Sequence, residues 1–222
     1  MKKIDLICYD FDGTLCNTLP DITDSMNVIF SRHGFDKIPE ERVRDFIGSG
    51  IGKLVERSVH HVLSGRDHSL AQDEIKKVGE EMAIYYSKHL TDRSHLYEGS
   101  IDILEHYSQV PQIIVSNKPE QMVRDMLAHY GIDTFFDLVI GGDTLEVCKP
   151  DLLVWDHIVK TMKLPNERFA IMVGDSLPDV IFGINANMLT IAVSYGYNDV
   201  PVLKEARADH IIDSLYELKN LI

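Results

Sequence analysis

The sequence predicts an α/β protein with a doubly wound parallel sheet and an inserted helical cap. Three observations support this fold class. Short apolar runs rich in β-branched residues recur along the chain, amphipathic helical patterns alternate with several of them, and one gap between two runs is far longer than the others. Alternating strands and helices joined by short turns are typical of a parallel sheet covered on both faces. The core is therefore expected to be Rossmann-like.

The strands are predicted from five apolar runs. The first, IDLICY at 4–9, has the composition of a strand buried on both faces. Similar runs follow at 112–116, 137–141, 169–174 and 189–194. Measured from Ile113 to Leu138, Ala170 and Thr190, successive runs lie 25, 32 and 20 residues apart. These spacings suit single crossover helices.

Two of these crossovers show an apolar face at helical spacing. One face consists of Met122, Met126, Leu127 and Tyr130, and the other of Leu152, Trp155, Ile158 and Met162. This periodicity predicts an amphipathic helix in each crossover.

The gap from Asp12 to Ile113 spans 101 residues (113 − 12), far more than one crossover needs. Its content is helical: Ile75, Val78, Met82, Tyr85 and Tyr86 recur at helical spacing, as do Leu54, Val55, Ser58, Val59 and Val62. Pro39 followed by EERVRDFIG reads as a further helix start. We therefore expect a catalytic core at 1–16 and 94–222 and a helical cap at 17–93. The His60-His61 doublet lacks metal-ligand spacing and is expected on a solvated helix face.

Composition and charge exclude some partners. Apolar residues make up 45 % and charged residues 26 %, as in ordinary globular proteins, and the net charge is −13. Because this charge repels polyanions, we expect no nucleic-acid and no membrane partner. Three widely spaced cysteines argue against a disulfide framework. With no signal-peptide or membrane-spanning run, the sequence predicts a cytoplasmic protein that is a monomer or a homodimer.

Polar side chains follow the predicted strand ends in a fixed order. They are Asp10 and Asp12, then Ser116, Asn117 and Lys118, then Lys149 before Pro150, then Asp175 with Asp179 four residues on. In an open parallel sheet the carboxyl ends of neighbouring strands line one crevice. The order therefore predicts a single site, although each segment alone has an ordinary structural explanation such as a helix cap or helix start.

Two aspartates at the first strand end suit hydrolysis of a phosphate monoester. Asp10 is the candidate nucleophile, since a phospho-aspartyl intermediate divides one slow reaction into two easier steps. Asp12 would protonate the leaving alcohol and then activate water. A carboxylate attacking an anionic phosphoryl group needs a hard cation, so Mg²⁺ is expected on Asp10, Asp12 and Asp175, with Asp179 as a ligand or support.

Cationic and polar groups are expected to hold the phosphate. Lys149 would neutralise phosphoryl charge, and Ser116 and Asn117 would offer hydrogen bonds to its oxygens. In the cap, SGIGK at 49–53 opens a helix with Ser49, Gly50 and Lys53, which could hold a substrate carboxylate, with Arg44 as a further candidate. A plain helix–helix turn explains that segment equally well.

The four strand-end segments resemble the signature motifs of the haloacid dehalogenase superfamily, and the DFDGTL pair at 10–15 resembles its phosphatase branch. FIGSGIGKLV at 46–55, SNKPEQMV at 116–123 and VSYGYND at 193–199 are similar to segments of bacterial phosphoglycolate phosphatases. This resemblance implies a magnesium-dependent phosphatase with a helical cap, hydrolysing 2-phosphoglycolate through Asp10. Asn17 and Asn187 depart from the family pattern without touching the predicted chemistry.

Other functions stay open at this point. The same site would suit pyrophosphate, a nucleoside monophosphate or a sugar phosphate in place of 2-phosphoglycolate, so the expected partner is a small phosphorylated metabolite. A signalling or binding module that accepts a phosphoryl group without turnover is a different class, but receiver domains, which are such signalling modules, lack the DxD pair and a large cap.

Overall fold

The computed structural model describes residues 3–64 and 71–222. The chain forms two compact units. We call the first, Met1–Asn17 with Leu96–Ile222, the sheet unit, and the second, Thr18–His95, the helical unit.

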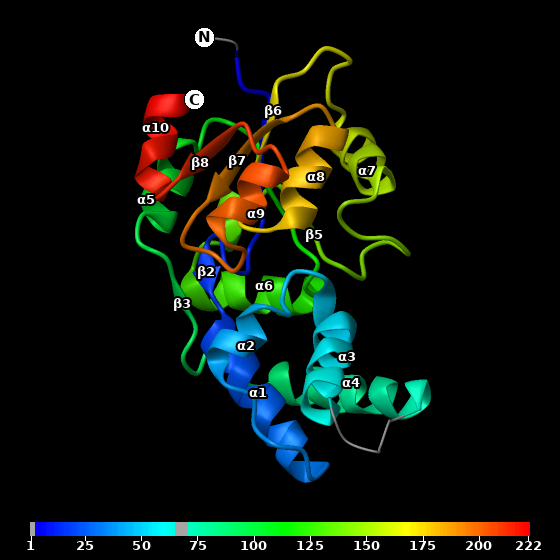
Figure 1. Ribbon diagram of the computed structural model, residues 1–222. Helices are drawn as coiled ribbons and strands as arrows, with labels where there is room; N and C mark the ends of the chain where they lie inside the picture. The colour runs from blue at the N-terminus through cyan, green and yellow to red at the C-terminus, as the bar shows by residue number, and fades with distance from the viewer. Residues whose placement is uncertain (1–2, 65–70) are drawn as a thin grey trace. The chain divides into compact units, whose positions relative to one another are not determined.

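The sheet unit contains a six-stranded sheet in the order β5-β4-β1-β6-β7-β8, with helices on both faces (Figure 1). All of its strand pairs are parallel. The strands are β1 (Leu6–Tyr9), β4 (Gln112–Val115), β5 (Leu138–Ile140), β6 (Ala170–Gly174), β7 (Leu189–Val193) and β8 (His210–Ile212). The predicted fold class is confirmed, and the five predicted strands are present. Strand β8 at the sheet edge was not predicted.

Strand β1 lies in the middle of the sheet and is completely buried. Cys8 pairs in register with Ile113 of β4 on one side and Met172 of β6 on the other. These side chains join one apolar cluster with Trp155 and Phe182, which come from two helices that cover this face. Burial on both faces explains why β1 is an unbroken apolar run.

The helices of the sheet unit follow its strands. They are α5 (Ser100–His106), α6 (Glu120–Tyr130), α7 (Leu152–Met162), α8 (Leu177–Asn185), α9 (Val200–Glu205) and α10 (Leu218–Leu221), with 3-10 turns η1 (Asp133–Phe135) and η2 (Leu215–Glu217). The two amphipathic helices predicted from the sequence are α6 and α7. Asp151 caps α7, because its carboxylate accepts a hydrogen bond of 2.8 Å from the Leu153 amide.

In the described part of the helical unit, four helices pack around an apolar core of their own. They are α1 (Leu19–Arg32), α2 (Glu40–Arg44), α3 (Gly50–Leu63) and α4 (Gln72–Tyr86). Met26, Phe30, Val55 and Met82 are among its buried side chains. The His60-His61 doublet is exposed in the last turn of α3, as predicted.

Asp21 holds the two ends of the helical unit together. Its carboxylate accepts hydrogen bonds from the Arg93 amide at 2.9 and 3.1 Å and from the Ser94 amide at 2.8 Å. The Ser94 hydroxyl adds a third donor at 2.6 Å. This buried carboxylate therefore fastens α1 to the segment that ends the unit.

The chain leaves and re-enters the sheet unit through two short strands. Strands β2 (Cys16–Asn17) and β3 (His95–Leu96) pair as a separate two-stranded sheet. Within the described residues, 3–64 and 71–222, no helix has both the length and the apolar character needed to cross a membrane.

Candidate active site

Asp10 is the first residue after β1, and the strand ladder fixes its backbone. Its amide donates to the Val173 carbonyl at 2.9 Å, and its carboxylate accepts from the Phe11 amide at 2.7 Å. The side chain is buried, and the Lys149 ammonium lies 3.2 Å from one carboxylate oxygen.

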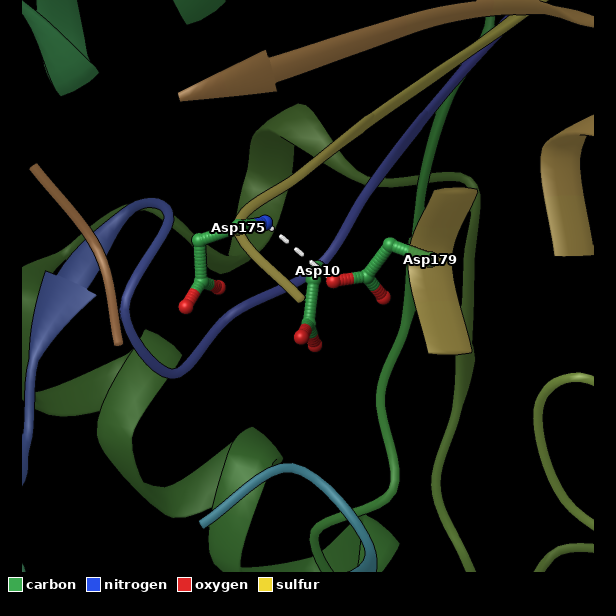
Figure 2. Close-up of side chains that lie close together, drawn as sticks. All are labelled: Asp10, Asp175 and Asp179. Atoms are coloured by element: carbon green, nitrogen blue, oxygen red, sulfur yellow. Dashed lines mark hydrogen bonds between the residues drawn. The ribbon is translucent and has the colours of Figure 1, made fainter. Parts of the chain in front are cut away.

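Asp175 and Asp179 follow the neighbouring strand, β6. Asp179 lies in the first turn of α8, where one carboxylate oxygen accepts from the Ser176 amide at 2.9 Å and the Ser176 hydroxyl at 2.6 Å. The same oxygen accepts from the Asp175 amide at 3.2 Å, the bond dashed in Figure 2. Its other oxygen accepts from Lys149 at 2.5 Å. Both carboxylate oxygens of Asp179 thus accept hydrogen bonds, one from Lys149 and the other from Asp175 and Ser176.

The three carboxylates form one cluster. Figure 2 shows Asp10 and Asp175 side by side, with Asp179 directed toward Asp10 from α8. One ligand oxygen from each lies within 4.8 Å of the others, and all three side chains are buried. Burial, together with the neighbouring charge of Asp179, raises the pKa of Asp10 to about 7. The same two causes raise the pKa of Asp175 well above its ordinary value.

Lys149 is the cation of this cluster. Burial opposes its charged form, but the nearby Asp10 and Asp179 carboxylates outweigh that effect and raise its pKa. Lys149 contacts two of the three buried carboxylates, so the cluster keeps excess negative charge in a buried place. Oxygen ligands at this spacing suit a hard divalent cation, which would compensate that charge, so the residues present fit the predicted magnesium.

Asp12 has a different partner from the other three aspartates. The Lys118 ammonium lies 3.0 and 3.3 Å from its two carboxylate oxygens, and both side chains are largely buried. The carboxylate cluster found among the described residues does not include Asp12. Lys118 was predicted to follow a strand end, but no role in the site was predicted for it. Its place two residues after Ser116 was the available signal.

Ser116 and Asn117 follow the end of β4. The Ser116 amide continues the ladder by donating to the Ile140 carbonyl at 2.9 Å. The Asn117 side chain donates to the Lys149 carbonyl at 3.1 Å. This bond places the β4 end next to the segment that supplies Lys149.

Two loops surround Asp175. The Thr14 hydroxyl donates to one carboxylate oxygen at 2.9 Å, and the Tyr197 amide donates to the other at 2.7 Å. A Cβ added to Gly196 would lie 2.1 Å from the Asp175 Cβ, so only glycine fits there. No role in the site was predicted for Thr14 or Tyr197, although they lie within the motifs at 10–15 and 193–199.

The four candidates from the helical unit lie around the start of α3. Ser49 is the residue before the helix, and Gly50 adopts φ 81°. Lys53 pairs with Glu56 at 2.7 Å, and Arg44 ends α2. The Ser49 hydroxyl accepts from Arg57 at 3.3 Å. These contacts are all local to the helical unit.

With this fold and this buried cluster established, comparison with known proteins defines the class. The chain belongs to the haloacid dehalogenase-like hydrolase family, whose sequence model matches residues 7–193. Within that class it is similar along its whole length to proteins named phosphoglycolate phosphatase. The protein of that name from Nitrosococcus oceani is 32 % identical, with 100 % of this chain and 98 % of that protein aligned. The one from Haemophilus influenzae is 31 % identical over 98 % of this chain and 97 % of that protein.

Solved structures agree with these sequence relatives. A crystal structure described as a predicted phosphoglycolate phosphatase from Haemophilus somnus superposes with a TM-score of 0.92 at 28 % identity. The alignment covers 100 % of this chain and 99 % of that chain. The family resemblance expected from the strand-end motifs is therefore confirmed, as is the expectation that the protein is an enzyme.

Proposed function

We propose that this protein is a magnesium-dependent phosphatase that hydrolyses 2-phosphoglycolate, or a similar small phosphate monoester, through a phospho-aspartyl intermediate on Asp10. The observation that carries the proposal is the position of Asp10, buried at the end of the central strand beside Lys149 and two further carboxylates. Full-length similarity to proteins named phosphoglycolate phosphatase supports the choice of substrate.

In the first step an oxygen of Asp10 attacks the phosphorus atom. The new bond joins Asp10 to phosphorus, the ester P–O bond breaks, and Asp12 gives its proton to the departing alkoxide oxygen. Lys118, on the Asp12 carboxylate, orients that side chain for the transfer.

In the second step water attacks the same phosphorus atom. Asp12 now takes a proton from the water, the bond from phosphorus to Asp10 breaks, and inorganic phosphate leaves with Asp10 restored as a carboxylate. Two successive transfers through one carboxyl group close the cycle without any other acid or base.

Asp10, Asp175 and Asp179 are the residues that would hold magnesium, and the ion, when bound, offsets the charge repulsion between nucleophile and phosphoryl group. Asp12 forms an ion pair with Lys118, so we assign Asp12 to proton transfer. Its part in metal binding stays a prediction.

Lys149, Ser116 and Asn117 are proposed to hold the phosphoryl oxygens. Lys149 already contacts the nucleophile, so its charge lies where the phosphoryl group must arrive. Asn117 lies beside it through the bond to the Lys149 carbonyl. The Ser116 hydroxyl has the chemistry of a phosphate donor at the end of β4.

The helical unit is proposed to act as the cap, with the start of α3 (Ser49, Gly50, Lys53) and Arg44 as candidates for the substrate carboxylate. An N-terminal turn with a glycine in the left-handed region and a nearby lysine suits an anion. The cytoplasmic location and the choice between monomer and homodimer stay predictions.

A phosphate-release assay tests the proposal. Purified protein is given 2-phosphoglycolate, pyrophosphate, a nucleoside monophosphate and a sugar phosphate, each with and without Mg²⁺. We expect metal-dependent release, fastest with 2-phosphoglycolate, and loss of activity by roughly 10³-fold or more in Asp10→Asn. Asp5→Asn is the matched control, because Asp5 lies just before the same strand and binds the Phe169 amide.

The possible outcomes separate mechanism from substrate. Robust turnover by Asp10→Asn would refute the phospho-aspartyl mechanism. Faster hydrolysis of another ester would keep the mechanism and replace the substrate. A stable phosphoprotein without phosphate release would identify a signalling module instead.

A further inference from the structure

Asp175 is held by hydrogen bonds on both of its oxygens, and one of the donors is a side chain. The Thr14 hydroxyl donates to Oδ1 at 2.9 Å, and the Tyr197 amide donates to Oδ2 at 2.7 Å. Thr14 is completely buried, and a carboxylate oxygen accepts more than one hydrogen bond or ligand. Each oxygen therefore has a further lone pair with which it could bind a cation.

Thr14 is itself anchored from the other side. Its carbonyl accepts a hydrogen bond of 2.8 Å from the Tyr195 hydroxyl. The Tyr195 ring packs against Tyr97, with centroids 4.5 Å apart, and the Tyr97 amide donates to the Leu15 carbonyl at 3.0 Å. The segment after Gly13 is thus held on two successive carbonyls, and the Thr14 side chain is left to face Asp175.

Close packing leaves Asp175 little room to turn. A Cβ at Gly13 would lie 2.5 Å from Asp175 Oδ2, and Gly13 has φ 83°. The carboxylate therefore lies against the backbone of the Gly13 turn as well as that of Gly196.

We propose that Thr14 is a positioning residue that fixes the Asp175 carboxylate in the orientation needed to bind the divalent cation, with Tyr195 holding Thr14 in place. This inference rests on the proposed function, since it assumes that Asp175 is a metal ligand. Removing a group that orients a metal ligand typically weakens metal binding 10- to 100-fold.

Metal binding to the substrate-free protein is the direct test. Dissociation constants for Mg²⁺, and for Mn²⁺ by electron paramagnetic resonance, are measured for the wild type, Thr14→Val and Thr14→Ser. Val keeps the shape and loses the donor, and Ser keeps the donor. We expect about 10- to 100-fold weaker binding in Thr14→Val, recovery to near the wild-type value in Thr14→Ser, and a smaller loss in Tyr195→Phe.

Two control variants remove the same kinds of bond elsewhere in the sheet unit. Thr190 is buried and donates to Asp209 at 2.7 Å, so Thr190→Val matches Thr14→Val. The Tyr107 hydroxyl donates to the Leu218 carbonyl at 3.1 Å, so Tyr107→Phe matches Tyr195→Phe. Both controls should lower the melting temperature of the metal-free protein without changing its affinity for metal.

The metal affinities of these variants separate the role of Thr14 from the metal dependence of the proposed function. Unchanged metal affinity in Thr14→Val, with a wild type that binds metal, would overturn the role of Thr14 and leave the proposed function intact. Weakened binding that Thr14→Ser does not restore would assign the effect to packing and also overturn it. A wild type that binds neither ion would instead remove the metal from the proposed function.

Discussion

The Lys118 ammonium lies 3.0 Å from Asp12 Oδ1 and 3.3 Å from its other oxygen, with only 2 % of the lysine side chain exposed. This pair joins the turn after β1 to the end of β4, which are 106 residues apart. Lys118 is thus an ionic partner of the proposed proton donor, and removing its charge should change the free energy of unfolding.

Lys118→Met should lower the free energy of unfolding by roughly 3–5 kcal/mol, because it leaves a largely buried carboxylate without its cation. Denaturant titration measures this loss. In the double variant Lys118→Met with Asp12→Asn, the summed losses should exceed the observed one by roughly 0.5–3 kcal/mol. Lys76→Met, which removes an exposed pair with Glu80, should cost at most about 1 kcal/mol. Simple additivity at positions 118 and 12 would mean that the pair is not formed in solution.

Without metal, the raised pKa of Asp10 makes the folded protein less stable as the pH rises. The folded state holds a proton between about pH 4 and pH 7 that the unfolded state has released, so stability is lost across this window. Asp10→Asn cannot ionise, and it should therefore melt above the wild type at pH 8, by about 2–4 °C for each kcal/mol recovered. The difference should shrink toward pH 5. An Asp10→Asn protein that is less stable at both pH values would contradict this account.

Bound magnesium should offset the loss of stability that ionisation of the buried Asp10 carboxylate causes at high pH. Since the ion needs ionised carboxylates, its stabilising effect should grow from pH 5 to pH 8. At about 100 times the dissociation constant it should add about 2.7 kcal/mol, or on the order of 5–10 °C in melting temperature at pH 8. Thermal melting with Mg²⁺ and with chelator checks this, and an equal shift at both pH values would argue against binding by Asp10 and Asp175.

Gly196→Ala should disturb Asp175 directly. The added Cβ would lie 2.1 Å from the Asp175 Cβ, a contact that forces one of the two loops to move. We expect activity to fall by roughly 10-fold or more, since a displacement of about 1 Å can cost about 10²-fold in rate. Gly79→Ala in α4 is the matched control, because nothing lies within 4 Å of its added Cβ. That change should stabilise the protein by about 1 kcal/mol. Equal activity in the two variants would show that the site tolerates the shift.

Asp21→Ala should destabilise the helical unit. The substitution leaves two backbone amides and a hydroxyl without their acceptor, at about 1–3 kcal/mol for each group that stays buried. Hydrogen exchange of the Arg93 and Ser94 amides should rise while that of β1 changes little. Asp24→Ala removes an exposed pair with Arg93 and serves as the control. Unchanged protection of Ser94 in Asp21→Ala would contradict the assignment.

Much of the sheet could be predicted because burial on both faces leaves a clear record in the sequence. Strands β1 and β6 are continuous apolar runs, and each is fully buried. Strand β8 was not predicted because it has only three residues and lies at the sheet edge. His210 is exposed there, so the strand does not need a continuous apolar run.

The site was less fully predictable than the fold. Strand ends and spacing located Asp10 and Asp175 because a parallel sheet brings such positions together. The reach of a long side chain such as that of Lys118 depends on packing, which spacing does not encode. Thr14 and Tyr197 donate hydrogen bonds to Asp175 through a hydroxyl and a backbone amide. Because such groups are common along any sequence, they do not mark these two residues as part of a site.

The position of β1 in the sheet also sets an order for events on the ribosome. Strand β1 is translated first, but its neighbours begin at Gln112 and Ala170, so it has no partner while the next hundred residues are made. The helical unit has its own core. The hydrogen bond from the Ser94 amide to Asp21, which joins the two ends of this unit, can form once Ser94 has left the ribosome exit tunnel. We expect this unit to fold during translation, before the sheet assembles. The nascent chain would then contain Asp10 and Asp12 but neither Lys149 nor Asp175, so we expect the enzyme to gain its chemistry only after β6 and Asp175 have been translated.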